Sequence, residues 1–259
     1  MCIFFLCIGM DTTAHTLAFT VYALAKYPEI QQKAQELADL LGEGDGGSNR
    51  QAELPKYLEA LLKESMRKYP TAATGSFRLV TAAEGYTLTP DIFLPKGWWV
   101  VVNIFCLQNS RSIWGADADE FLPERWLASG SGSVDAVVSA TPGGPDVDPL
   151  DSAIDPLDHG ATAGACGSTA SPFASPAAYG GTGPSPAELS FCPFSFGSRN
   201  CLGMNLALME LRMALCMLLS KYHFELCGED QLDEANVLET SFTMRPRDGM
   251  PVRITKRVK

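Results

Sequence analysis

The chain has 259 residues, 46% of them hydrophobic, and a formal net charge of −10 at pH 7. This length allows one or two domains with a sizeable core, and the acidic balance argues against nucleic acid, which needs a basic surface. The eight cysteines show no C-x-x-C spacing and the three histidines are scattered, which gives no support to a zinc finger and suits a reducing compartment.

The first segment predicts one half of a buried helix. Residues 1–10 are apolar, but the run ends at Asp11, well short of the roughly 20 residues that span a bilayer. No basic region precedes it, as one would in a secretory signal. We therefore expect no transmembrane segment in this chain. A second helix is predicted from Pro28 to about Leu41, followed by a glycine-rich linker at 42–49.

Residues 54–67 predict a third helix, in which Leu58 and Leu61 follow helical spacing. Glu64 and Arg67 are three residues apart, so they share one face. An exposed pair of this kind contributes only about 0.2–0.5 kcal/mol and is common. The pair gains meaning only if it is buried.

Two strands are predicted next, at residues 77–80 and 94–104, joined by a glycine turn. Arg78 lies in the first of them, and on sequence alone it could be an ordinary solvated charge. Residues 121–126 (FLPERW) then bring a further arginine, Arg125.

Residues 128–189 differ in composition from the rest of the chain. They consist largely of Gly, Ser, Ala, Pro and Asp, and no Lys or Arg occurs between Arg125 and Arg199. Such a segment cannot bury a core, so we expect a disordered acidic insert. It could dock a partner or be an inert low-complexity insertion.

Residues 194–203 (FSFGSRNCLG) place one cysteine before a long apolar helix. Gly197 and Gly203 allow tight turns and close approach, and Arg199 supplies a cation near the sulfur. The free N–H groups and dipole at the start of the helix favour a thiolate at Cys201. The alternative is a buried structural cysteine, which is common at such junctions.

Motifs along the chain together resemble the cytochrome P-450 superfamily. Residues 194–203 match its haem-binding signature FxxGxRxCxG at every specified position. Residues 8–13 resemble its oxygen-activation motif AGxDTT, residues 64–67 its ExxR motif and residues 121–126 its PERF box, with Trp in the last place. The tail at 238–254 resembles the closing hairpin of the family.

The resemblance implies a mainly α fold with small β-sheets, namely the C-terminal haem-binding half of the cytochrome P-450 fold, truncated. Residues 1–127 would hold the oxygen-activation helix, the ExxR helix, a β-region and the PERW box. Residues 128–189 would be the insert. Residues 190–259 would hold the haem-thiolate loop, a core helix that is apolar nearly all round, and the hairpin.

The implied cofactor is haem b, iron protoporphyrin IX, with the Cys201 thiolate as axial ligand of the iron. Arg199 and Arg78 would pair with the propionates, and the position of Gln108 is often a histidine near the same group. The cofactor-binding residues implied by the resemblance are Cys201, Arg199, Arg78, Phe194, Gly197 and Gly203.

Asp11 and Thr12 are the implied catalytic residues, because an acid beside an alcohol can relay the protons that O–O cleavage consumes. Ile8 stands where the family has a small residue and could crowd the space over the haem. Taken alone, Asp11 or Thr12 could instead cap a helix. The implied structural network, which would lock the haem-side core, comprises Glu64, Arg67 and Arg125.

The implied reaction is insertion of one oxygen atom from dioxygen into a small organic substrate, with electrons from an NADPH-dependent reductase or another donor. The loop at 72–76 and the hairpin tip near Ser241 and Phe242 would face the substrate. One alternative is a non-catalytic truncated fragment that binds haem weakly or not at all. Another is an interaction module that acts through the acidic insert. The sequence does not specify the substrate or the compartment.

Overall fold

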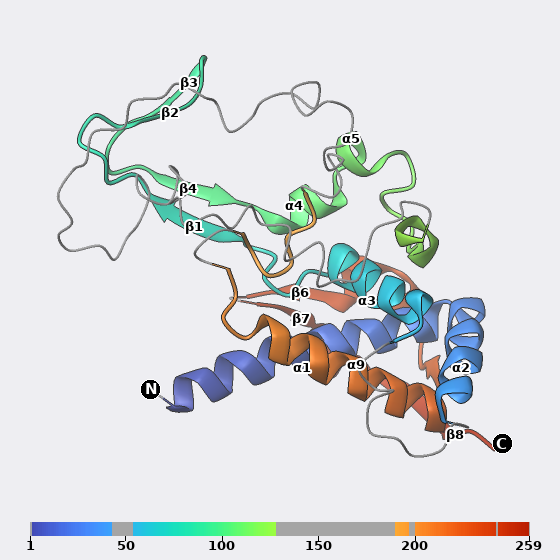
Figure 1. The fold of residues 1–259 in the computed structure, drawn as a ribbon. Helices are drawn as coiled ribbons and strands as arrows, with labels where there is room; N and C mark the ends of the chain where they lie inside the picture. Colours follow the sequence, from blue (N-terminus) through green and yellow to red (C-terminus); the bar gives the residue numbers. More distant parts are fainter. Residues whose placement is uncertain (1, 43–53, 128–189, 197–199, 242, 259) are drawn as a thin grey trace.

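The computed structural model describes residues 2–42, 54–127, 190–196, 200–241 and 243–258, so the predicted insert lies outside the described residues. Figure 1 shows the longest helices gathered together and the β2–β3 hairpin extending away from them. These helices are α1 (Cys2–Lys26), α2 (Pro28–Gly42), α3 (Lys56–Lys68) and α9 (Met204–Lys221).

The described strands form two-stranded antiparallel sheets: β1 (Ser76–Leu79) with β4 (Trp99–Val102), β2 (Tyr86–Thr89) with β3 (Ile92–Leu94), β5 (Tyr222–Leu226) with β8 (Val252–Lys256), and β6 (Leu238–Thr240) with β7 (Met244–Pro246). The short helices are α4 (Ile104–Asn109), α5 (Arg111–Trp114) and α10 (Glu234–Val237), and the 3-10 helices are η2 (Pro123–Trp126), η5 (Glu229–Leu232) and η6 (Arg247–Gly249). The prediction of a mainly α chain with small β-sheets is confirmed.

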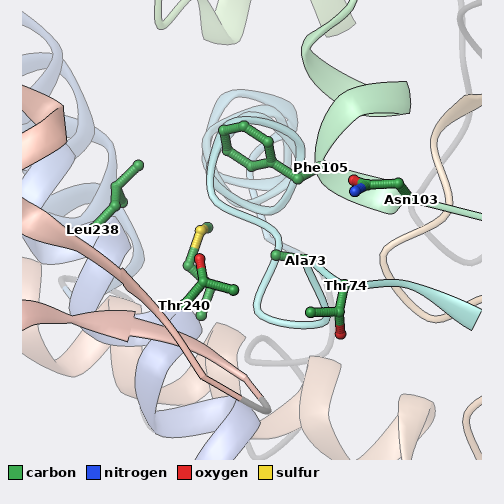
Figure 2. Close-up of a pocket in the computed structure, with 7 residues that line it drawn as sticks. Ala73, Thr74, Asn103, Phe105, Leu238 and Thr240 are labelled. Carbon is green, nitrogen blue, oxygen red and sulfur yellow. The ribbon is translucent and has the colours of Figure 1, made fainter.

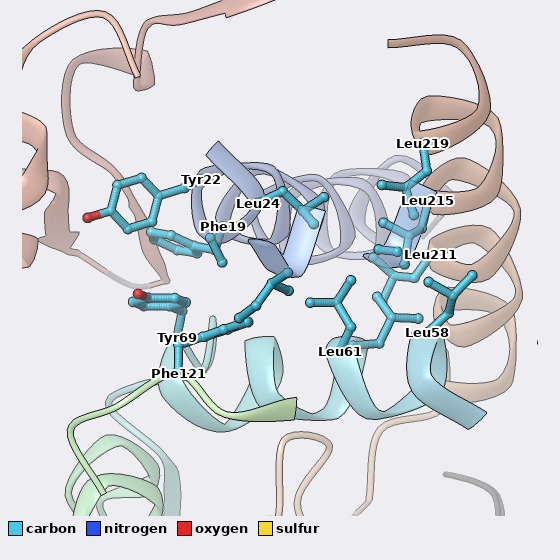
Figure 3. Close-up of a cluster of buried hydrophobic side chains, with 14 of the residues drawn as sticks. Phe19, Tyr22, Leu24, Leu58, Leu61, Tyr69, Phe121, Leu211, Leu215 and Leu219 are labelled. Atoms are coloured by element: carbon cyan, nitrogen blue, oxygen red, sulfur yellow. The ribbon is translucent and has the colours of Figure 1, made fainter. Parts of the chain in front are cut away.

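The main hydrophobic core lies where α1, α3 and α9 meet (Figure 3). Phe19 and Leu24 come from α1, Leu61 from α3, and Leu211 and Leu215 from α9, and each is buried. Burying a side chain of this size contributes about 1.5–3 kcal/mol. This core therefore holds α9 against α1 and α3.

Helix α9 is less buried than expected for a core helix that is apolar nearly all round. It buries only one face, because α1 and α2 contact it on that side. Leu208 and Leu219 lie on the buried face, whereas Met209 and Met217 are exposed. No helix in the described part of the chain combines the length and apolar character needed to cross a bilayer.

The two predicted strands do pair, as β1 and β4, with Arg78 opposite Val100. They are not joined by a simple glycine turn, however, because the β2–β3 hairpin lies between them. The second strand, predicted at residues 94–104, also extends too far at its C-terminal end, because β4 ends at Val102. Ile104 begins α4, where the side chain of Asn103 accepts a hydrogen bond from the Cys106 N–H (2.9 Å) and caps the helix.

The β5–β8 sheet is joined to α2 by glutamine side chains. The buried Gln31 accepts a hydrogen bond from the Phe224 N–H (2.8 Å) and donates to the Phe224 carbonyl (2.9 Å). Gln35 donates to the carbonyl of Tyr222 (2.9 Å). Two side chains of α2 thereby bond backbone groups on the side of β5 that faces away from β8.

Candidate active site

Cys201 is an exposed, free cysteine in a hydrogen-bonded turn before α9. Its N–H donates to the Phe194 carbonyl (2.9 Å), and its carbonyl accepts from the Met204 N–H (3.3 Å). At Gly203, an added Cβ would lie 4.0 Å from the Cys201 sulfur, which is an ordinary van der Waals contact. The turn therefore presents the thiol outward from the start of a helix.

The rest of the signature loop is only partly described. Gly197 and Arg199 lie outside the described residues. Phe194 packs against the cluster of Trp114, Trp126, Phe191 and their neighbours. Ser195 has a positive φ of 64°, which a residue with a side chain seldom adopts.

The loop also contacts the β-region. The Ser195 hydroxyl lies 2.9 Å from the hydroxyl of Ser76 in β1. Arg78, two residues further along β1, lies on the same face of the strand as Ser76. It is half-buried and donates to the Phe77 carbonyl (3.1 Å). The structure therefore places Arg78 on the strand face that meets the loop.

Glu64 and Arg67 form a fully buried ion pair, with both side chains 0% exposed. Glu64 Oε1 accepts from Arg67 Nη2 (2.8 Å) and Arg125 Nε (3.2 Å), and Glu64 Oε2 accepts from Arg67 Nε (2.9 Å). The Leu122 N–H (3.0 Å) and Trp126 Nε1 (2.9 Å) complete the five hydrogen bonds. The tryptophan thus adds a donor that a phenylalanine in this place would lack.

Gln108 is fully buried, and its carboxamide bonds backbone groups on both sides. Nε2 donates to the carbonyls of Met66 (2.9 Å) and Arg67 (3.2 Å), and Oε1 accepts from the Cys192 N–H (2.9 Å). The resemblance places this position near a propionate, and in the structure the Gln108 carboxamide bonds protein backbone groups. It links the C-terminal end of α3 to the segment that leads into the signature loop.

Asp11 and Thr12 lie inside α1, which is helical without interruption from Cys2 to Lys26. The helix-cap alternative is therefore wrong for both residues. Asp11 Oδ2 accepts from Thr243 Oγ1 (3.1 Å), and Oδ1 lies 3.5 Å from Nε2 of His15, one turn further on. Neither His15 nor Thr243 belongs to the motif. The spacing of four residues between Asp11 and His15 is a sequence signal that could have indicated His15, whereas Thr243 is too distant in the sequence to be indicated by spacing.

A cavity of about 170 Å³ opens between the α3–β1 loop and the β6–β7 hairpin. Figure 2 shows its lining residues, which are Ala73, Thr74, Asn103, Phe105, Leu238, Thr240 and Met244. A hydrogen bond from the Met244 N–H to the Thr71 carbonyl (2.8 Å) holds the two segments together. The loop and the hairpin expected to face substrate thus meet at one cavity, while Phe242 lies outside the described residues.

Comparison with known proteins gives the chain its family. It is similar to cytochrome P-450 cyp-13B1 of Caenorhabditis elegans (30% identical, 93% of this chain, 36% of the relative). It is also similar to cytochrome P-450 CYP13A5 of the same organism (31%, 98% and 38%) and to cytochrome P-450 3A31 of Mesocricetus auratus (27%, 89% and 35%). The chain therefore spans about a third of the length of these relatives.

The sequence model of the cytochrome P-450 family matches residues 1–137 and 182–251, which is most of the chain and includes all four motifs. The chain belongs to the cytochrome P-450 family.

Proposed function

We propose that this chain supplies the haem-thiolate part of a monooxygenase that inserts one oxygen atom from dioxygen into an organic substrate. Membership of the family implies a haem cofactor, and haem b is the form we propose. The observation that carries the proposal is the exposed, free Cys201 in the turn before α9. Residues 1–127 and 190–259 would build the site, with 128–189 as an insert.

The residues around Cys201 fit such a cofactor. Among the described cysteines of this region, Cys201 is the exposed, free thiol, and Gly203 adds no side chain beside it. The nearby Cys192 is unsuitable, because it is buried, and burial raises the pKa of its thiol to about 12, which disfavours the thiolate that an iron ligand must be. Among the described residues, no group of three or more His, Cys, Asp or Glu side chains could hold a bare metal ion.

When bound, haem supplies the iron at which dioxygen is activated. Cys201 would ligate that iron, and Arg78 and Arg199 would pair with the propionates. Asp11 and Thr12 would deliver protons from α1. The half-exposed carboxylate of Asp11 is held toward the hairpin by Thr243 and remains open to water, as a proton carrier must be.

The substrate would lie against the cavity shown in Figure 2, next to the α3–β1 loop and the β6–β7 hairpin. Its lining is largely apolar, with Thr74, Asn103 and Thr240 as polar groups. A small apolar organic molecule with one or two polar atoms suits such a lining. A reductase or another donor would supply the electrons.

The alternative is a fragment without catalysis that binds haem weakly or not at all. The observation that favours it is that the chain spans about a third of its relatives' length. In that case the motifs keep the fold of this region without forming a complete pocket.

The carbon monoxide difference spectrum of the reduced chain, expressed with haem supplied, tests the proposal. A strongly red-shifted Soret band that is lost in Cys201→Ser and kept in Cys192→Ser would support thiolate ligation by Cys201. A band at the position of neutral-ligand haem, or no band, would contradict it and favour the alternative.

A further inference from the structure

Gln108 lies in a continuous path of hydrogen bonds that runs from α3 to Cys201. The path begins at the carbonyls of Met66 and Arg67, which belong to the last turn of α3 and have no partner within the helix. The Gln108 amide group bonds both carbonyls, and its oxygen bonds the Cys192 N–H. One side chain therefore joins the helix end to the segment that precedes the signature loop.

From Cys192 the path continues through the backbone of the loop. The Cys192 carbonyl accepts from the Ser195 N–H (3.0 Å), and the Phe194 carbonyl accepts from the Cys201 N–H (2.9 Å). The Cys201 carbonyl then accepts from Met204, the first residue of α9. Each bond fixes the next peptide group, so the position of Cys192 affects the position of the sulfur.

The backbone of Gln108 is also fixed. Its carbonyl accepts from Arg67 Nη1 (2.9 Å), and the neighbouring Asn109 side chain donates to the Lys68 carbonyl (3.3 Å). The buried Glu64 holds the same Arg67 guanidinium by two further hydrogen bonds. The carboxamide is therefore attached to a part of the core that a buried ion pair holds in place.

We propose that Gln108 is a positioning residue for Cys201, because its carboxamide anchors the start of the thiolate loop to the end of α3. The inference rests on the proposed function of Cys201 as the iron ligand. A carboxamide suits the task because it offers two N–H donors and an acceptor at once, whereas a neutral imidazole offers one of each. Substitution should therefore displace the sulfur, in addition to lowering stability.

Gln31 provides a matched control. It is also fully buried, its amide group donates to the carbonyls of Leu24 (3.0 Å) and Phe224 (2.9 Å), and its oxygen accepts from the Phe224 N–H (2.8 Å). Gln31→Leu therefore removes the same three bonds to backbone groups as Gln108→Leu, together with one bond that the Gln35 side chain donates to the Gln31 oxygen (3.3 Å). It does so between α1, α2 and β5, and outside the path to Cys201.

Hydrogen exchange of the haem-free full chain, read by mass spectrometry, tests the anchor directly. In Gln108→Leu, exchange in residues 190–196 should accelerate about 10–100-fold, as expected when a buried amide loses its partner. In Gln31→Leu, the same residues should exchange at a rate close to that of the wild type. An acceleration that is equal in both variants, or absent in Gln108→Leu, would overturn the proposal.

The wild type gives a second test that does not depend on a variant folding. The Cys192 amide should exchange as slowly as the amides inside α3, and rapid exchange would overturn the anchor. In the reduced, carbon monoxide-bound chain, Gln108→Leu should convert part of the red-shifted band to the neutral-ligand band, while Gln31→Leu should not. If no red-shifted band forms even in the wild type, the proposed function fails, but the exchange measurements still decide the anchor.

Discussion

Replacing Glu64 with Gln, which exchanges one carboxylate oxygen for an amide group, should strongly destabilise the described core. Both Glu64 and Arg67 are 0% exposed, and the carboxylate accepts five hydrogen bonds from Arg67, Arg125, Trp126 and the Leu122 backbone. The amide nitrogen of Gln cannot accept the bonds that end on the oxygen it replaces, and two guanidinium groups would lose their common counter-charge. Breaking a buried pair from one side costs about 3–5 kcal/mol.

Such a loss is a large share of the roughly 5–15 kcal/mol that stabilises a folded domain. Urea unfolding followed by far-UV circular dichroism measures it. With a slope of about 2 kcal/mol per molar urea, the midpoint of Glu64→Gln should fall by about 2 M. Trp126→Phe, which removes only one donor to the carboxylate, should cost about 1.5–3 kcal/mol and fall between the wild type and Glu64→Gln.

Glu239→Gln is the matched control for this reasoning. Glu239 also pairs with an arginine, since Arg245 Nη2 lies 3.0 Å from its Oε1, but its side chain is 39% exposed and that of Arg245 is 50% exposed. Solvent screens such a pair, so we expect no measurable change in the urea midpoint. A midpoint for Glu64→Gln that is no lower than that of Glu239→Gln would refute the argument that burial makes the network important.

Two further predictions concern titratable side chains. Iodoacetamide at pH 8 should modify the exposed Cys201 and leave Cys192 intact, because burial raises the pKa of Cys192 to about 12; peptide mapping reads the result, and equal modification of both would contradict it. Burial also raises the pKa of a set of tyrosines, that of Tyr27 to about 12. Unfolded tyrosines ionise near pH 10, so above about pH 10 the unfolded state binds fewer protons than the folded state, and stability should fall as the pH rises. Absorbance at 295 nm and circular dichroism should then change together at high pH, and ionisation of this set before unfolding would contradict the prediction. The tyrosines are Tyr22, Tyr27, Tyr57 and Tyr69.

The sequence predicted the elements whose signals are local. Pro28 and the acid after it indicate the start of α2, and the spacing of Leu58 and Leu61 indicates the buried face of α3. The three charged residues of the network could be named from their motifs. Their burial could not, because an i,i+3 pair reads the same on an exposed helix.

The features that sequence reasoning missed depend on distant backbone atoms. The partners of Gln108 are carbonyls and an N–H group, which carry no residue identity and leave no trace in a motif. The β2–β3 hairpin has strands of only four and three residues, with a register shift between Thr87 and Thr89, and such short strands show no clear alternation. Helix α9 is apolar on nearly all sides, so its sequence could not tell which face is covered.

The glutamine side chains on β5 have a consequence for association between chains. A two-stranded sheet leaves backbone groups open along each outer strand, and an open edge can pair with a strand of another molecule. In β5, the N–H and carbonyl of Phe224 are already hydrogen-bonded to Gln31, and the carbonyl of Tyr222 is already hydrogen-bonded to Gln35. A helix thus blocks edge-to-edge aggregation at this strand with two amide side chains, where other proteins use an additional strand, a proline or a bulge.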